Sequence, residues 1–299
     1  MKILVTGGGG FIGAWITRRL LDDGHAVRVL DRAERTALLH RIVGDAIHEV
    51  EWRCGDIAQR PEFERALAGC DGIIHLAGLL TPECRTNPNR ALRVNLGGTL
   101  NVFEAALAVG LKRVVYSSSA GVYGPDDGQR PAPATLYGVT KLAAEGIARV
   151  YALEHGIASV GFRPYIVYGP GREGGASAGP SLACQAAVRG LPYEIPYTGE
   201  VGMVHIDDVA EAFVRALAVP EHRAHVFTLQ GETASTDRVI EAIRAQVPSA
   251  RITAAGASMP IAPRLAEDDL RQHMPELPNT SLATGIARTI STYRSWETC

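Results

Sequence analysis

The stretch KILVTGGGGFIGAWITRRLLDD, residues 2–23, decides the fold. Residues 2–6 form an apolar run of strand length, the next seven residues include five glycines, and residues 14–23 carry apolar side chains at helical spacing. The pattern predicts a strand, a glycine loop and a helix in succession. The glycines at 7, 10 and 13 fit G-x-x-G-x-x-G, and those at 8, 10 and 13 fit G-x-G-x-x-G. Such a loop lets a pyrophosphate approach the free N–H groups at the helix start.

A second apolar run, residues 26–30, ends in Asp31, which lies 18 residues after Gly13. This offset is near the roughly 20 residues expected for the acidic residue that binds the adenosine ribose. Together the two signals predict a dinucleotide site. The carboxylate of Asp31 would repel a 2′-phosphate, which favours NAD over NADP. Arg32 weakens that preference if it turns inward, but a solvated Arg32 is favoured because arginine is mostly exposed.

Strand and helix patterns alternate along the rest of the chain. The expected strands are residues 49–53, 72–76, 112–116 and 158–163, and the expected helices include residues 87–110 and 136–151. This alternation predicts an α/β fold, a Rossmann-type doubly wound parallel sheet. We expect a dinucleotide-binding domain at 1–165, to which a strand and helix near 201–219 return. Residues 166–200 and 220–299 are expected to form a smaller C-terminal α/β substrate lobe, with a strand at 225–229.

The residues around positions 117–141 carry the chemistry. The strand at 112–116 delivers Ser117, Ser118 and Ser119 to its carboxyl end, where ligands bind in open parallel sheets. Tyr137 and Lys141 are four residues apart, so a helix places them on one face. A nearby ammonium would stabilise the phenolate, and a serine hydroxyl would hold the same substrate oxygen. Alone, this spacing equally describes a half-buried tyrosine beside a surface lysine.

Four further polar residues are candidate site residues, and three of them have two interpretations. His75 lies inside an apolar strand, and a buried core histidine is favoured over a catalyst. Asp56 would meet the adenine amino group, cap the helix that starts near Pro61, or do both. The amide of Asn95 would tie loop backbone behind the nicotinamide. His205 precedes a helix expected at 208–217 with an aspartate N-cap, and a structural role for the histidine is favoured.

The ordered motifs resemble those of an extended short-chain dehydrogenase/reductase of the NAD-dependent epimerase/dehydratase family, to about Val219. They are Thr6-Gly7-x-x-Gly10-x-x-Gly13, Asp31, Asp56-Ile57, His75-Leu-Ala-Gly78, Asn95, Ser117-Ser-Ser119, Tyr123-Gly124, Tyr137-x-x-x-Lys141, Arg163-Pro164, Tyr168-Gly169-Pro170-Gly171 and His205-Ile-Asp-Asp-Val209. The resemblance implies that Ser119 supplies the catalytic hydroxyl and that Tyr137 is the acid/base. It also implies that Lys141 lowers the tyrosine pKa and binds the nicotinamide ribose.

The resemblance further implies two sets of binding residues. The cofactor set is Gly7, Gly10, Phe11, Ile12, Gly13, Asp31, Arg32, Asp56, Ile57, Leu76, Ala77, Gly78, Asn95, Ser117, Tyr137, Lys141 and Tyr165. The substrate set is Leu79, Ser118, Ser119, Val122, Tyr165, Arg172 and Ser177. No metal site is expected.

Two positions depart from the nucleotide-sugar enzymes of this family. Ile166 stands where those enzymes usually have an asparagine that holds the substrate diphosphate, and Glu200 lies where a basic residue is usual. Two phosphates need positive charge or directed donors, which neither residue supplies. Arg172 and Arg189 are possible substitutes. We therefore expect a smaller substrate, such as a sugar, sugar acid or polyol, beneath a loop at 171–179 that is either a strap or plain surface.

The leading functional hypothesis is an NAD-dependent oxidoreductase that transfers hydride between nicotinamide and a secondary alcohol or ketone. An alternative is a nucleotide-sugar epimerase or dehydratase with tightly bound NAD. Another is a non-catalytic dinucleotide sensor. The resemblance also implies a homodimer in which the helices at 87–110 and 137–151 of two chains pack together. The apolar stripe at positions 92, 96, 100, 103 and 107 fits this, but it equally fits packing on the sheet.

Composition limits the partners and the location. The chain has 299 residues, a formal net charge of −2 and no basic run, so neither a nucleic acid nor a membrane surface is an expected partner. The N-terminus enters a strand directly and no segment is long and apolar enough to span a bilayer, which favours the cytoplasm. Five cysteines without a Cys-x-x-Cys motif predict neither a disulfide framework nor a structural zinc site.

Overall fold

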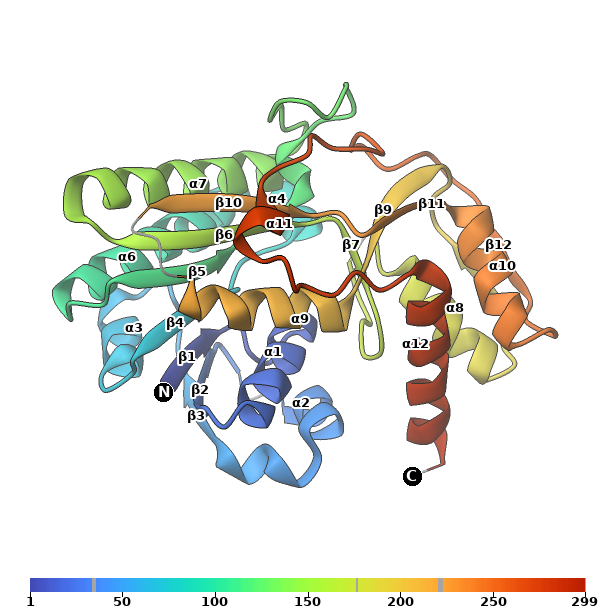
Figure 1. The fold of residues 1–299 in the computed structure, drawn as a ribbon, viewed down its shortest axis with the longest axis horizontal. Helices are drawn as coiled ribbons and strands as arrows, with labels where there is room; N and C mark the ends of the chain where they lie inside the picture. The colour runs from blue at the N-terminus through green and yellow to red at the C-terminus, as the bar shows by residue number, and fades with distance from the viewer. Residues whose placement is uncertain (34–35, 176, 220–222, 299) are drawn as a thin grey trace.

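The computed structural model describes residues 1–33, 36–175, 177–219 and 223–298. Its centre is a parallel sheet of seven strands in the order β10-β6-β5-β4-β1-β2-β3 (Figure 1). The strands are β1 (Lys2–Thr6), β2 (Ala26–Asp31), β3 (Val50–Cys54), β4 (Gly72–His75), β5 (Arg113–Ser117), β6 (Ala158–Pro164) and β10 (Ala224–Leu229). The order reverses next to β1, which creates the crevice that binds ligands in doubly wound sheets.

Helices cover both faces of this sheet, because side chains of successive strand residues point to opposite faces. Ile3 and Val5 of β1 share one core with α1 (Phe11–Asp22) and α9 (Ile206–Arg215). Leu4 shares the opposite core with α3 (Arg60–Leu67), α6 (Gly98–Ala108) and α7 (Leu136–His155). The predicted doubly wound α/β fold is confirmed.

The helix expected over residues 87–110 is interrupted. It consists of α5 (Pro88–Ala91), a π-helical segment η2 (Leu92–Gly97) and α6. Single π turns widen a helix locally and are frequent at functional sites. Here the widened turn carries Asn95, whose buried amide reaches the loop after β4.

A smaller lobe lies beside the seven-stranded sheet, at the right of Figure 1. It holds a three-stranded sheet of β11 (Glu232–Ser235), β9 (Glu200–His205) and β7 (Ile166–Tyr168), and a pair of β12 (Ile252–Ala254) with β8 (Tyr193–Ile195). The helices α8 (Gly179–Val188), α10 (Thr236–Gln246) and α12 (Leu282–Glu297) pack against one apolar core with these strands. The shorter elements are α2 (Thr36–Val43), η1 (Gly44–Glu49), α4 (Thr81–Thr86), η3 (Ala120–Val122), η4 (Ala216–Ala218) and α11 (Leu270–His273).

Two strands belong to different sheets from those that the sequence predicts. β10, expected in the smaller lobe, pairs with β6 as the edge of the seven-stranded sheet. β9, expected to return to that sheet, instead pairs with β7 and β11. The apolar pattern of a strand reports that it is buried but not which strand it pairs with. The division into two lobes stays a prediction, with these two strands reassigned.

The start of α9 also differs from expectation. The helix begins at Ile206 and its N-cap is His205, whose Nδ1 accepts the N–H of Asp207 at 3.3 Å. Asp208, expected near the cap, instead accepts from the N–H and hydroxyl of Thr280 at 2.7 and 2.6 Å. A buried carboxylate needs donors, and here they come from the segment before α12. No helix in the described part of the chain has both the length and the apolar character to cross a membrane.

Candidate active site

The glycine loop lies between β1 and α1, as the sequence predicts. Gly10 is the N-cap of α1 and no side chain caps the helix, so its first turn is open to an anion. A Cβ at Gly13 would lie 2.4 Å from the carbonyl oxygen of Gly7, so only glycine permits this tight turn. Trp15 donates its indole N–H to the Pro170 carbonyl at 3.0 Å and ties α1 to the turn after β7.

Asp31 and Asp56 lie at the carboxyl ends of neighbouring strands. Asp31 accepts the N–H groups of Gly9 at 3.2 Å and Arg32 at 2.7 Å, and so holds the glycine loop against β2. Asp56 accepts the N–H of Ala58 at 2.9 Å. The N-cap of α3 is Gln59, so the proposed capping role of Asp56 is wrong, because its carboxylate turns to the nearer N–H. The side chain of Arg32 is exposed.

Asn95 organises the loop after β4. Its Oδ1 accepts the N–H of Leu79 at 2.7 Å, and its Nδ2 donates to the Leu79 carbonyl at 3.1 Å and to the Thr140 hydroxyl at 3.1 Å. The amide therefore holds the loop backbone, as predicted, and also links it to α7, whereas its place behind the nicotinamide stays a prediction. Thr6 holds the start of this loop, because its hydroxyl accepts the N–H groups of Leu76 and Ala77, each at 3.2 Å.

Ser119, Tyr137 and Lys141 meet beyond the end of β5. The Ser119 hydroxyl accepts the N–H of Gly121 at 3.0 Å and lies near enough to the Tyr137 phenol to lower its pKa. A Cβ at Gly138 would lie 2.0 Å from the Gly121 carbonyl oxygen, so glycine lets α7 approach the serine segment. Lys141 donates to the Ser117 carbonyl at 2.7 Å, and its Nζ lies 5.7 Å from the centre of the Tyr137 ring.

The electrostatics of Tyr137 differ from the prediction. Burial raises the pKa of Tyr137 to about 12, against a smaller lowering by the hydrogen bond from Ser119. Burial also lowers the pKa of Lys141 to about 8. The expected lowering of the tyrosine pKa by Lys141 is therefore absent, because both groups lose solvation when buried and the ammonium is directed at Ser117. Tyr137 is protonated at neutral pH in this structure.

Glu145 and Arg163 support the catalytic segment and were not singled out as site residues from the sequence. Arg163 donates to both carboxylate oxygens of Glu145, at 2.7 and 2.6 Å, and to the Tyr123 hydroxyl at 2.7 Å. Ser118 donates to the same carboxylate at 2.5 Å. Glu145 lies one helical turn after Lys141, so its position in α7 was a usable signal.

His75 and His205 are both structural, as favoured. His75 is 4 % exposed, with its two ring nitrogens 2.7 Å from the Thr6 hydroxyl and 3.2 Å from the Thr99 hydroxyl. Burial lowers the pKa of His75 to about 3, which keeps the ring neutral. His205 caps α9 and packs edge-on against Tyr168.

Most of the expected substrate residues have little solvent exposure, and their roles stay predictions. Leu79, Ser118, Val122 and Tyr165 are buried, with exposed fractions of 6, 1, 0 and 6 %. The Tyr165 hydroxyl donates to the Ala262 carbonyl at 2.8 Å, inside the smaller lobe, so its expected roles toward cofactor and substrate are not supported. The sequence shows that these residues follow the catalytic strands but not which way their side chains point.

Arg172 and Ser177 do come together. Arg172 donates to the Ser177 hydroxyl at 2.7 Å and to the Val167 carbonyl. Burial lowers the pKa of Arg172 to about 10, and the phenols of Tyr197 and Tyr137 are near enough to oppose this. No carboxylate pairs with Arg172 within the described ranges of the chain. The sequence did not identify Tyr197, which is 2 % exposed and belongs to the segment after β8.

Ile166 and Arg189 are the other two positions considered for binding a substrate diphosphate, and neither supplies a positive charge to the site. Ile166 is 2 % exposed in the core of the smaller lobe. Arg189 lies at the surface and pairs with Glu297 at 2.8 Å, so it is not a substitute for the missing basic residue. Of the two candidate arginines, Arg172 is the one placed toward Tyr137.

A glycine loop before an uncapped helix, an acidic residue after β2 and a Ser-Tyr-Lys group at the carboxyl edge of the sheet define a nicotinamide-dependent enzyme of the extended short-chain dehydrogenase/reductase type. The model of the NAD-dependent epimerase/dehydratase family matches residues 3–229. The chain belongs to this family.

Curated relatives include both reductases and epimerases. A dihydroflavonol 4-reductase from Hordeum vulgare is 29% identical over 242 residues, 73% of this chain and 68% of that protein. A UDP-glucose 4-epimerase from Azospirillum brasilense is 31% identical over 241 residues, 72% of this chain and 68% of that protein. The structure of MoeE5 in complex with UDP-glucuronic acid and NAD has a TM-score of 0.84 and 26% identity, covering 99% of this chain and 100% of that one.

The residues present fit a dinucleotide. The glycine turn and the uncapped start of α1 suit a pyrophosphate, and Asp31 keeps its carboxylate at the end of β2. Lys141 and Asn95 border Gly78, where a Cβ would lie 3.2 Å from Asn95 Oδ1 and 3.8 Å from Lys141 Nζ. Gly78 thus keeps the loop close to both side chains.

Proposed function

We propose that this enzyme interconverts a secondary alcohol and a ketone of a small polar substrate, using NAD. The observation that carries the proposal is the convergence of Ser119, Tyr137 and Lys141 beyond the end of β5. The preference for NAD over NADP rests on Asp31, beside the glycine loop, and on the exposed side chain of Arg32.

In this proposal one proton moves between Tyr137 and the substrate oxygen. The protonated Tyr137 donates it to the substrate oxygen during ketone reduction, and in alcohol oxidation the deprotonated phenolate of Tyr137 accepts it from the substrate hydroxyl. Ser119 donates a hydrogen bond to the same oxygen and stabilises its developing charge. Lys141 holds the Ser117 backbone and adds positive charge. When bound, NAD supplies or accepts the hydride and, in its oxidised form, adds positive charge to the site.

We infer that the substrate carries a carboxylate, as a sugar acid does. Arg172 supports this, because it is a partly buried guanidinium near Tyr137 with only neutral partners among the described residues. A partly buried cation without an opposite charge is costly, and a bidentate carboxylate would satisfy it. The complex of MoeE5 with UDP-glucuronic acid is consistent with such a ligand in this fold.

A nucleotide-sugar epimerase or dehydratase is the second candidate, since a relative is named UDP-glucose 4-epimerase. Ile166 and Arg189 argue against it, because neither offers a charge to a diphosphate in the cleft. A non-catalytic dinucleotide sensor is less favoured, since Ser119, Tyr137 and Lys141 are all present.

The test is a panel of sugars, sugar acids and polyols, assayed for NADH or NADPH formation with each cofactor. We expect NADH to accumulate with an acid. If the purified protein instead holds NAD tightly, converts UDP-sugars and forms no net NADH, the epimerase hypothesis replaces this one.

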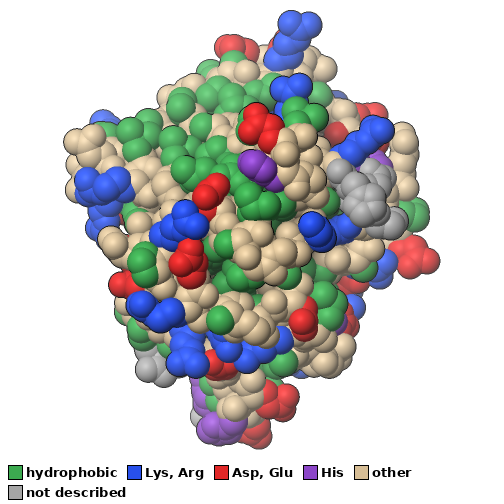
Figure 2. Space-filling view, turned by 90° about the vertical axis from the view of Figure 1, so that its left-hand side faces the viewer, with side chains coloured by type: hydrophobic (Ala, Val, Ile, Leu, Met, Phe, Trp, Pro, Cys, Tyr) green, Lys and Arg blue, Asp and Glu red, His purple; other side chains and the backbone are tan. Residues whose placement is uncertain are grey.

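We also propose a homodimer through η2, α6 and α7. Phe103 is fully buried against the sheet, whereas Leu92, Leu100 and Leu107 are 41, 42 and 38 % exposed, so part of the apolar stripe faces outward. Leu153 of α7 is 73 % exposed. Figure 2 views the side of the molecule at which one end of α6 and of α7 lies, and hydrophobic side chains gather on it. Light scattering after size exclusion would detect the dimer, and a monomeric mass would contradict it.

A cytoplasmic location remains a prediction. Cys54, Cys70, Cys84 and Cys184 are free thiols, as expected in a reducing compartment. Cys299 lies outside the described residues.

A further inference from the structure

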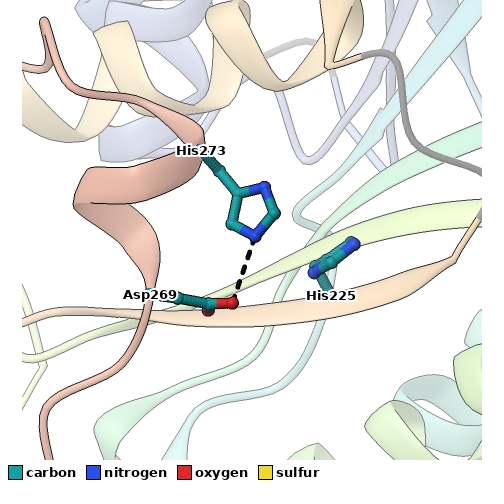
Figure 3. A group of neighbouring side chains, drawn as sticks. All are labelled: His225, Asp269 and His273. Atoms are coloured by element: carbon teal, nitrogen blue, oxygen red, sulfur yellow. Dashed lines mark hydrogen bonds and ion pairs between the residues drawn. The ribbon is translucent and has the colours of Figure 1, made fainter.

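Three potential metal ligands meet where α11 packs on the edge of the seven-stranded sheet. His225 comes from β10, His273 from α11, and Asp269 is the N-cap of α11 (Figure 3). One ligand atom from each residue lies within 4.8 Å of the other two. This group was not predicted from the sequence, because His225 is 44 residues before Asp269 and only the fold brings them together.

The distance between two of these ligand atoms is close to the distance between ligands around a bound zinc ion. His273 Nε2 lies 3.1 Å from Asp269 Oδ2. Ligands at about 2.0–2.1 Å from a tetrahedral zinc ion are about 3.3 Å apart. The rings of His225 and His273 have centroids 4.7 Å apart and the three ligand atoms lie within 4.8 Å of one another, so the ligands must draw closer on binding to reach that spacing. A metal ion would replace the hydrogen bond between His273 and Asp269.

The surroundings hold the ligands while leaving one side open. Leu270 and Met274, 9 and 4 % exposed, fix the α11 segment in the core beside Phe227. The Thr228 N–H on the edge strand donates to Asp268 at 2.5 Å, which fastens the same segment to β10. The Asp269 side chain is 51 % exposed, so an ion and a fourth, solvent ligand can reach the site.

The chemical types of the three ligands indicate which class of metal ion would bind. Two imidazoles and one carboxylate suit zinc and neighbouring first-row transition metals. Calcium requires six to eight oxygen ligands and magnesium an octahedral oxygen shell, which this group does not offer. We propose that His225, Asp269 and His273 bind one divalent transition-metal ion of the zinc type, which clamps α11 onto strand β10.

The ion would stabilise the fold and not take part in the reaction. In the sheet register Phe227 of β10 pairs with Phe162 of β6, and Phe162 pairs with Ser117 of β5. His225 is therefore two residues back from the catalytic edge, and β10 lies two strands from β5, at about 4.8 Å per strand. The clamp covers the free edge of the sheet, where an unpaired strand is prone to association.

The test titrates zinc into the tag-free full chain after chelator treatment, with calorimetry and elemental analysis. We expect one zinc per chain, and at least about 10-fold weaker binding in His225→Gln, His273→Gln and Asp269→Asn. Saturating zinc should raise the melting temperature of the wild type by about 5 °C and leave the variants unchanged. Asp269→Asn changes a half-exposed side chain, so it serves even if a histidine variant does not fold.

Two substitutions act as matched controls. His48 of η1 is an exposed histidine, and Cys54 is an exposed thiol that is itself a potential zinc ligand. His48→Gln and Cys54→Ser should bind zinc as the wild type does. If the wild type takes up no stoichiometric zinc, or if the three ligand variants bind it unchanged, the proposal is wrong.

Discussion

Lys141 donates its ammonium hydrogen bond to the main-chain oxygen of Ser117 over 2.7 Å, and this bond joins helix α7 to the end of strand β5. The lysine therefore fixes the distance between the tyrosine helix and the serine segment, in addition to supplying charge. Because it is only 8 % exposed, its charge is held at a cost to stability.

That cost gives a pH-dependent prediction. The pKa of Lys141 falls from 10.5 to about 8 on folding, so between these values the unfolded chain binds more protons than the folded one. Stability must then rise with pH across this window. Relative to Lys141→Met, the wild type should gain about 2 kcal/mol of unfolding free energy between pH 8 and 10, measured by urea denaturation.

The matched control is Lys112→Met, which removes an exposed lysine. It should leave the pH dependence of the wild type intact. Parallel curves for wild type and Lys141→Met would show that burial does not depress the lysine pKa.

Gly13→Ala should impair cofactor binding. The added methyl group would lie 2.4 Å from the Gly7 carbonyl oxygen and 2.6 Å from Gly8 Cα, so the loop must move. We expect NAD affinity to fall at least about 10-fold, because the pyrophosphate requires this turn. Isothermal titration measures it. Gly97→Ala, where no atom lies within 4 Å of the new Cβ, should bind NAD normally, and equal affinities for both variants would refute the role of Gly13.

Glu145→Gln should destabilise the protein strongly. It leaves Arg163, whose side chain is 14 % exposed, without its charge partner and weakens the support of Ser118. Breaking a buried pair in this way typically costs about 3–5 kcal/mol. Denaturant unfolding should show this loss, whereas Asp22→Asn, in an exposed pair with Arg18, should change little. Recovery in the double variant Glu145→Gln/Arg163→Met would identify the unpaired arginine as the cause.

Arg172→Met should discriminate between acidic and neutral substrates. If Arg172 binds a carboxylate, the KM for an acidic substrate should rise about 10- to 100-fold, in line with a charged hydrogen bond. The KM for a neutral polyol should change much less. Arg189→Met serves as the control, since Arg189 pairs with Glu297 at the surface. Equal losses for acidic and neutral substrates would remove the basis for a sugar acid.

The sequence predicted the glycine loop between β1 and α1 and the proximity of Tyr137 and Lys141 to the serine segment, because glycine spacing and helical spacing are local signals. It did not predict which sheet receives β9 and β10, because strand pairing depends on distant segments. It also did not predict that Ser118 and Val122 are buried, with the Ser118 hydroxyl bonded to Glu145. The direction of a side chain in a loop depends on tertiary contacts that no spacing encodes.

The tyrosine pKa was mispredicted for a related reason. Helical spacing brings Lys141 near Tyr137, but the balance between attraction and desolvation depends on burial depth and on where the ammonium points. Both are properties of the folded site.

The substitution Tyr137→Phe tests whether Tyr137 transfers the proton, because it removes one hydroxyl and leaves the ring and the cofactor cleft in place. With a substrate that reduces NAD in the wild type, kcat should fall by about 10²–10⁴-fold, the usual contribution of a positioned acid or base. NAD affinity, measured by titration, should remain within about twofold, because the glycine loop and Asp31 are unchanged. A variant that binds NAD normally and keeps the wild-type rate would contradict the assignment of Tyr137 as the proton donor and acceptor.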